Sequence, residues 1–164
     1  MGGRVYISVV GAGECDDRTA SVAEAVGREV AKRGAVLVCG GKGGVMEAAC
    51  RGAKSAGGLT VGILPDMDRN ECNPYVDFSI VTGLGSVRNS LVVLTGQAVI
   101  AVGGAYGTLS EIAFAGIYGR KVIGLGTWRL GPPAPLGTAI TEASSAEQAV
   151  SLAFEAAVEL NAES

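Results

Sequence analysis

The sequence predicts an α/β fold of the Rossmann-like type, with three α/β/α layers around a mainly parallel sheet of six or seven strands. Short runs of β-branched and apolar residues alternate with longer amphipathic stretches, the pattern of parallel strands joined by crossover helices. Glycine clusters follow several of the predicted strands, as in tight strand-to-helix turns. The 164 residues are 48% hydrophobic and 18% charged, so we expect one domain over residues 1–164.

Periodicity assigns the individual elements. Apolar runs of three to six residues predict strands at 5–10, 35–39, 60–64, 78–81, 98–102, 121–125 and, as a short edge strand, 139–141. Apolar residues at helical spacing predict helices at 19–33, 44–55, 86–95, 106–118 and 146–160. Each crossover is expected to be right-handed. Residues 65–77 lack periodicity and predict a surface loop near the site, and residues 127–136 form a second, Gly/Pro-rich loop.

Composition excludes several classes of site. The chain has no histidine, which excludes Ser-His-Asp triads and His-ligated metals. Its net charge is −3 and its basic residues are scattered, so no nucleic acid polymer is expected as a partner. The four cysteines lack CxxC spacing and are interpreted as reduced thiols, with no structural metal: Cys15, Cys39, Cys50 and Cys72. Neither a membrane span nor a signal-peptide pattern is present, which predicts a cytoplasmic protein without membrane contact.

Three glycine-rich turns predict a phosphate site. The carboxyl ends of parallel strands share one edge of the sheet, so these turns should converge there. Glycine brings bare N–H groups close to an anion, and the following helix N-terminus adds partial positive charge. A single such turn has a purely steric explanation, whereas three together favour a ligand. The candidate ligand-binding residues are Gly11, Gly13, Gly40, Gly41, Lys42, Gly43, Gly44, Gly103, Gly104, Tyr106, Gly107 and Thr108.

Two charged residues are candidates for catalysis. Arg88 stands near a predicted helix start, where a cation opposes the helix dipole, and its guanidinium is suited to grip a phosphate or carboxylate. Glu111 follows Thr108 by one helical turn, and either serves the ligand or caps the helix. Lys42 either reaches an anion or is simply exposed to solvent. Asp16 stands where the G-x-G-x-x-G dinucleotide pattern needs glycine, which disfavours NAD.

These residues carry a family resemblance. Residues 103–111, GGAYGTLSE, resemble the PGGxGTxxE signature of the LOG-type proteins of the SLOG superfamily, long labelled lysine decarboxylases. Arg88 precedes Glu111 by the same separation as the catalytic arginine and glutamate of that family. Residues 40–46, GGKGGVM, are similar to its GGGxxGLM turn. The resemblance covers residues 5 to about 125 and implies catalytic roles for Arg88 and Glu111.

Two functions follow from the resemblance. The lead-in to Arg88, GSVRN, departs from the M-H-x-R-K of the phosphoribohydrolases, in which Lys stands at the position of Asn89. Residues 81–89 and 47–58 are more similar to the molybdenum-cofactor carrier branch, which implies a pterin phosphate, with the molybdenum cofactor as a carried ligand. The alternative is a hydrolase that cleaves the N-glycosidic bond of nucleoside 5′-monophosphates. Pyridoxal phosphate is not expected, because such decarboxylases usually include a ring-stacking histidine.

Surplus apolar residues predict self-association. The helices predicted at 86–95 and 106–118 contain more apolar surface than one face of a sheet needs. We therefore expect a homodimer or homotetramer with closed symmetry. The residues in question are Leu91, Leu94, Ile112, Phe114 and Ile117.

Overall fold

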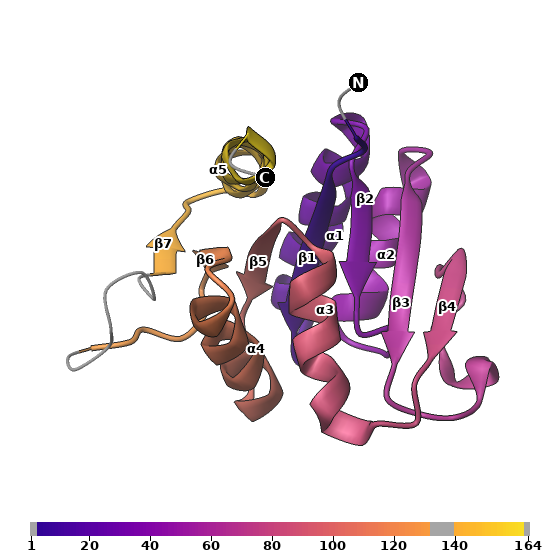
Figure 1. Ribbon diagram of the computed structural model, residues 1–164. Coiled ribbons are helices and arrows are strands. Elements are labelled where there is room, and N and C mark those ends of the chain that lie inside the picture. The colour runs from indigo at the N-terminus through magenta and orange to yellow at the C-terminus, as the bar shows by residue number, and fades with distance from the viewer. Residues whose placement is uncertain (1–2, 132–139, 163–164) are drawn as a thin grey trace.

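Seven strands form one sheet in the order β4-β3-β2-β1-β5-β6-β7, and every neighbouring pair is parallel. The structure is a computed structural model that describes residues 3–131 and 140–162. The strands are β1 (Tyr6–Gly11), β2 (Val36–Cys39), β3 (Leu59–Leu64), β4 (Phe78–Val81), β5 (Ala98–Val102), β6 (Lys121–Leu125) and β7 (Ile140–Glu142). The α/β fold class predicted from the sequence is confirmed (Figure 1).

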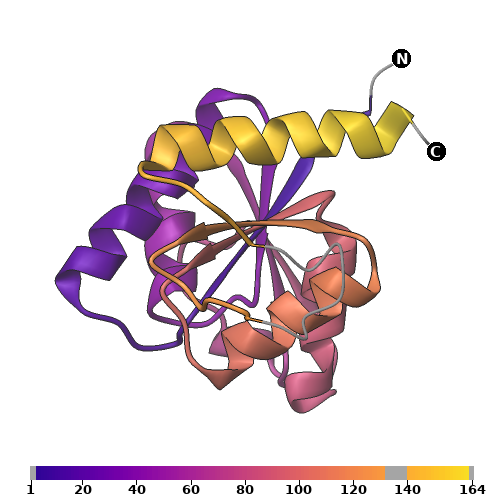
Figure 2. The same cartoon turned by 90° about the vertical axis from the view of Figure 1, so that its left-hand side faces the viewer.

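Helices cover both faces of the sheet. They are α1 (Asp17–Lys32), α2 (Val45–Ser55), α3 (Asn89–Thr95), α4 (Tyr106–Ile117) and α5 (Ala146–Ala162), with short 3-10 turns η1 (Arg69–Glu71) and η2 (Gly85–Arg88). Figure 2 shows α1 and α5 on one side of the strands and α3 and α4 on the other. Strand order runs from β1 out to β4 and then from β5 out to β7, so connections of the usual right hand put the crossover helices α1 and α2 on the face opposite α3 and α4.

Two apolar cores lie on either side of the sheet. The larger joins inward residues of β1, β2 and β5, such as Ile7 and Leu37, to the apolar faces of α1, α2 and α5. The smaller includes Val38, Val99 and Ile112 and lies beneath α3 and α4. Since β2 and β5 are buried along their whole length, their sequences are continuous runs of apolar residues.

Backbone contact fixes the crossing of α1 and α2. A Cβ on Gly27 would lie 1.8 Å from the carbonyl oxygen of Ala49, and a Cβ on Gly52 would lie 1.9 Å from that of Glu24. Glycine at both positions therefore lets the helices approach closely. The other end of α2 begins at Val45, and its Met46 borders the functional site.

Three expectations from the sequence need adjustment. The segment predicted as a helix from residue 86 starts as the η2 turn and becomes α-helical only at Asn89, after two glycines with positive φ, Gly83 and Gly85. Ile112 was assigned to a surface between subunits, but it is 1% exposed and belongs to the core. The edge strand is Ile140–Glu142; residue 139 and loop residues 132–136 lie outside the described residues.

In the described segments, 3–131 and 140–162, no helix is both long enough and apolar enough to span a membrane.

Substitution of Gly44 tests the close contact between the turns after β1 and β2. Gly44 has φ 60°, and a Cβ there would lie 2.4 Å from the carbonyl oxygen of Ala12. We expect Gly44→Ala to lower the free energy of unfolding by about 2–5 kcal/mol, from left-handed strain plus overpacking. Gly57→Ala is the control, because φ is also positive there but the space is open, so about 1–2 kcal/mol is expected. Equal losses in urea denaturation would contradict the steric argument.

Candidate functional site

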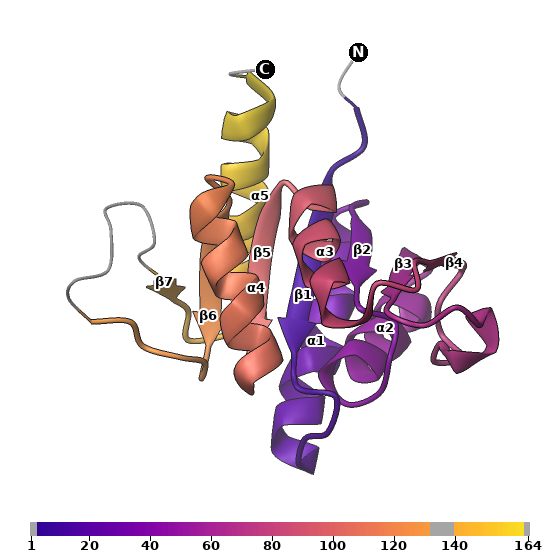
Figure 3. The ribbon, with the colours of Figure 1, turned by 60° about the horizontal axis from the view of Figure 1, so that its bottom comes forward.

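A cavity of about 340 Å³ opens at the carboxyl ends of the central strands. It lies at the switch point of the sheet, where the chain order reverses between β1 and β5 and ligands of open α/β sheets bind. Figure 3 brings this end of the molecule towards the viewer. The lining residues come from four turns and the starts of three helices: Gly11, Ala12, Gly13, Met46, Pro65, Gly85, Ser86, Arg88, Asn89, Ala105, Gly107, Thr108 and Glu111.

The first turn of α4 supplies backbone donors to the cavity. Gly103 and Gly104 have φ of 57° and 143°, a sharp turn that only glycine makes without strain. The first hydrogen bond within α4 joins the Leu109 N–H to the Ala105 carbonyl, which also accepts from Trp128 Nε1 at 3.2 Å. The preceding N–H groups, at residues 106–108, belong to the first turn, which offers no acceptor inside its own helix. This turn is therefore suited to bind an anion.

Arg88 is the cation of the cavity. It ends η2 at the start of α3 and is only 7% exposed. Its Nη1 donates to Asn89 Oδ1, and its Nη2 lies 3.4 Å from the Gly40 carbonyl oxygen. Arg88 Nε is buried without a hydrogen-bond partner among the described residues. Burial lowers the pKa of Arg88, while the charge of Glu111 opposes that shift, and a guanidinium stays charged in either case.

Glu111 lies opposite Arg88 on the inner face of α4. It is 5% exposed, and its Oε1 lies 3.8 Å from Arg88 Nη1, beyond hydrogen-bonding distance. Burial raises the pKa of Glu111 to about 8, even though the positive charge of Arg88 acts to lower it. Desolvation therefore outweighs the attraction of the nearby cation, and the site favours the neutral form of the carboxyl group.

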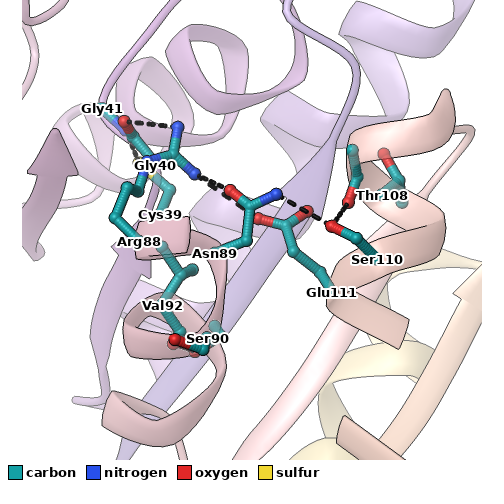
Figure 4. Close-up of polar contacts among 12 residues, drawn as sticks. Cys39, Gly40, Gly41, Arg88, Asn89, Ser90, Val92, Thr108, Ser110 and Glu111 are labelled. Atoms are coloured by element: carbon teal, nitrogen blue, oxygen red, sulfur yellow. Dashed lines mark hydrogen bonds and ion pairs between the residues drawn. The ribbon is translucent and has the colours of Figure 1, made fainter. Parts of the chain in front are cut away.

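A chain of hydrogen bonds connects the two sides of the cavity (Figure 4). Beyond its contact with Arg88, the Asn89 side chain donates from Nδ2 to Ser110 Oγ at 2.9 Å. Ser110 Oγ in turn donates to the Gly107 carbonyl oxygen at 2.6 Å. We call this chain the Arg88–Asn89–Ser110 relay. It ties the start of α3 to the first turn of α4.

The predicted site residues separate into two groups. Gly11, Gly13, Gly107 and Thr108 line the cavity together with Arg88 and Glu111. The remaining candidates lie outside its lining: Gly40, Gly41, Lys42, Gly43, Gly44, Gly103, Gly104 and Tyr106.

Those outer residues have other contacts. The Gly40 carbonyl faces Arg88 Nη2, so the turn after β2 lies behind the guanidinium. Lys42 Nζ is 2.8 Å from Asp66 Oδ2 and 3.2 Å from Glu71 Oε2, ion pairs that tie the loop after β3 to this turn. Tyr106 is exposed and packs its ring against Trp128, with centroids 6.0 Å apart.

Sequence reasoning missed several residues that line the cavity, notably Asn89, Met46 and Pro65. Asn89 had been noted only as a departure from a family pattern, and its place next to Arg88 was the one signal that could have found it. Within residues 3–131 and 140–162, no group of three or more His, Cys, Asp or Glu side chains could hold a metal ion.

Comparison with known proteins shows the family of the chain. The model of the SLOG cluster4 family matches residues 4–159. The chain belongs to the SLOG cluster4 family. Its membership agrees with the SLOG superfamily predicted from the glycine-rich motif and Arg88. An uncharacterized protein from Archaeoglobus fulgidus is 50% identical over 121 residues, which are 74% of this chain and 80% of that protein.

Two solved structures similar to this SLOG chain are those of proteins named after the molybdenum cofactor. The molybdenum cofactor binding protein of Rippkaea orientalis superposes with a TM-score of 0.84 at 38% identity, covering 93% of this chain and 97% of that one. The Moco carrier protein of Chlamydomonas reinhardtii gives 0.82 at 32% identity, covering 96% and 99%. The expected proximity to the molybdenum-cofactor carrier branch is therefore confirmed.

The raised pKa of Glu111 predicts how stability depends on pH. Between its ordinary pKa of 4.5 and the folded value of about 8, the folded state binds the proton more tightly than the unfolded state. Stability from this group is thus complete at low pH and falls as pH rises through that window. We expect Glu111→Gln to unfold at a higher temperature than the wild type at pH 8.5, with the difference shrinking as the pH falls towards 5.

The control is Glu159→Gln, which removes an exposed carboxylate from α5. Calorimetry of the three proteins across pH 5–8.5 makes the comparison. A stabilisation by Glu111→Gln that does not change with pH would contradict the raised pKa of Glu111.

Proposed function

We propose that this chain binds a phosphorylated small molecule in the cavity and acts as a carrier of the molybdenum cofactor, a pterin with a terminal phosphate. The main support is the buried Arg88 guanidinium, whose Nε lacks a partner among the described residues, beside the first turn of α4. A buried cation and free backbone donors together suit a phosphate. Similarity to the two molybdenum-cofactor proteins supports the pterin as the rest of the ligand.

Each part of the cavity has a role in this proposal. The N–H groups of Gly107 and Thr108 bind the phosphate, and Arg88 adds a charged hydrogen bond. The bare turn at Gly11–Gly13 lets the ligand approach the backbone. Met46 and Pro65 give apolar walls against which the planar ring packs.

The second candidate is the nucleoside monophosphate phosphoribohydrolase. It is favoured by the pairing of Arg88 with Glu111, whose raised pKa suits general-acid chemistry on a leaving base. Glycosidic hydrolysis usually employs two carboxyl groups, and Glu111 is the one carboxyl group among the described residues that line the cavity. The carrier role needs no second carboxyl group, and for this reason we prefer it.

Ligand binding tests the carrier proposal directly. We expect purified molybdenum cofactor to quench the fluorescence of the protein on titration under anaerobic conditions, and a pterin phosphate to co-purify with natively expressed protein by mass spectrometry. Arg88→Ala should weaken binding by about 1.5–3 kcal/mol, the usual value of a charged hydrogen bond. Arg28→Ala is the matched control, since it removes a guanidinium from the outer side of α1. Equal affinities for all three proteins would contradict the site.

Base release separates the two candidates. Wild type and Glu111→Gln are incubated with a panel of nucleoside 5′-monophosphates, and free base is measured by chromatography. A carrier releases no base above the blank. Release that depends on Glu111 would overturn the carrier proposal in favour of hydrolysis.

Self-association is a further proposal from the exposed apolar side chains of α3 and α4. Leu91, Leu94 and Ile117 are all exposed on these helices, and Ile117 is 72% exposed. We expect a closed homo-oligomer at micromolar concentration by light scattering. Ile117→Glu should shift the mass towards the monomer, because a charge in an apolar interface is costly. A monomeric mass for the wild type would refute the proposal.

A further inference from the structure

Asn89 lies between the Arg88 guanidinium and the first turn of α4, whose N–H groups are the backbone donors of the cavity. The residue begins α3, is 5% exposed, and lines the cavity. Its amide contacts Arg88 with one end and Ser110 with the other (Figure 4). The relay therefore joins two helices that are brought together only by the fold.

The direction of every bond in the relay is fixed by chemistry. A guanidinium has only donors, so the amide atom that faces Arg88 must be the oxygen. The amide nitrogen then faces Ser110 Oγ, which must accept, and the hydroxyl proton is left for the Gly107 carbonyl oxygen. That carbonyl shares its peptide plane with the N–H of Thr108, one of the first-turn donors. A hydrogen bond at the oxygen orients this peptide and polarises its N–H.

The relay also holds the Arg88 guanidinium apart from Glu111. Arg88 Nη1 is bonded to Asn89 and stops 3.8 Å short of Glu111 Oε1. Gly40 holds Nη2 from the opposite side. Without the amide oxygen, Nη1 would be free to move towards the Glu111 carboxyl group, 3.8 Å away. A hydrogen-bonded ion pair there would favour the ionised form of Glu111, whose charge would offset the cation that the anion needs.

We propose that Asn89 is the positioning residue of this site: its amide keeps the Arg88 guanidinium away from Glu111 and couples it to the first turn of α4, so that both face one bound phosphate. This inference rests on the proposed anion site. It assigns to that site a residue that orients the guanidinium and the first-turn N–H groups of α4 towards the same anion. Lysine at position 89 cannot replace Asn89, because an ammonium has no acceptor for Nη1.

The first measurement needs no ligand. We titrate the Glu111 carboxyl carbon by NMR in isotopically labelled wild type, Asn89→Leu and Asn89→Asp. In Asn89→Leu the freed guanidinium moves onto Glu111, so the pKa of Glu111 falls by about 1 unit. In Asn89→Asp the new carboxylate retains the guanidinium and repels a charged Glu111, so the pKa of Glu111 rises. Opposite shifts distinguish positioning from a general loss of packing, which would not depend on the charge at position 89.

The second measurement uses inorganic phosphate as the probe in calorimetric titrations. Ser110→Ala breaks the relay at a half-buried position, where folding is not at risk, and should weaken phosphate binding about three- to tenfold, as should Asn89→Leu. Ser110→Thr keeps the hydroxyl and should restore wild-type affinity. Ser90→Ala is the control, because its hydroxyl bonds the Val87 carbonyl outside the relay.

The two measurements fail independently. A wild type that binds no phosphate would refute the anion site and the proposed function, while the shifts of Glu111 in ligand-free protein would still decide whether Asn89 positions Arg88. An unchanged pKa of Glu111 in Asn89→Leu, or full phosphate affinity in Ser110→Ala, would overturn the positioning role even in a protein that binds phosphate well.

Discussion

The Arg88 guanidinium is taken out of water where β2, α3 and α4 meet, and a buried cation must be compensated from its surroundings. The Gly40 carbonyl and the Asn89 amide compensate two of its nitrogens, and Nε remains without a partner in the described part of the chain. Glu111 lies 3.8 Å from Nη1, but burial raises the pKa of its carboxyl group, so its negative charge compensates the cation only in part. The turn after β2, the start of α3 and the first turn of α4 are thus arranged around one charge.

The parallel sheet explains why these pieces meet. Each strand ends at the same edge, so turns far apart in the sequence become neighbours at the switch point between β1 and β5. Loop 65–77 is drawn to the same edge by the ion pairs of Lys42. What distinguishes this cavity from an ordinary strand-to-helix crevice is the combination of a buried guanidinium with a carboxyl group that prefers to stay protonated. Because burial weakens the negative charge of Glu111 and a guanidinium stays charged, the positive charge dominates in this pair, which suits an anionic ligand.

Sequence reasoning succeeded where the signal is local. The strands were found because buried parallel strands such as Val36–Cys39 are apolar throughout, and the turns because glycine clusters interrupt the pattern. Asn89 and Ser110 could not be paired in advance, since their contact exists only after α3 and α4 pack together. Likewise, nothing local indicates that the turn Gly40–Gly44 would lie behind Arg88 instead of lining the cavity, or that Ile112 faces inward.

The glycine pair at the α1–α2 crossing affects how variation among related sequences should be interpreted. Any side chain at Gly27 or Gly52 would occupy the space of a carbonyl group on the opposite helix, so both positions tolerate essentially one residue. Substitution would push α2 outward and displace Met46 at the edge of the cavity. These two glycines, which are remote from the cavity, would therefore vary as little as binding residues among related sequences. Their invariance would reflect the short distance between α1 and α2 and would not indicate a role in ligand binding.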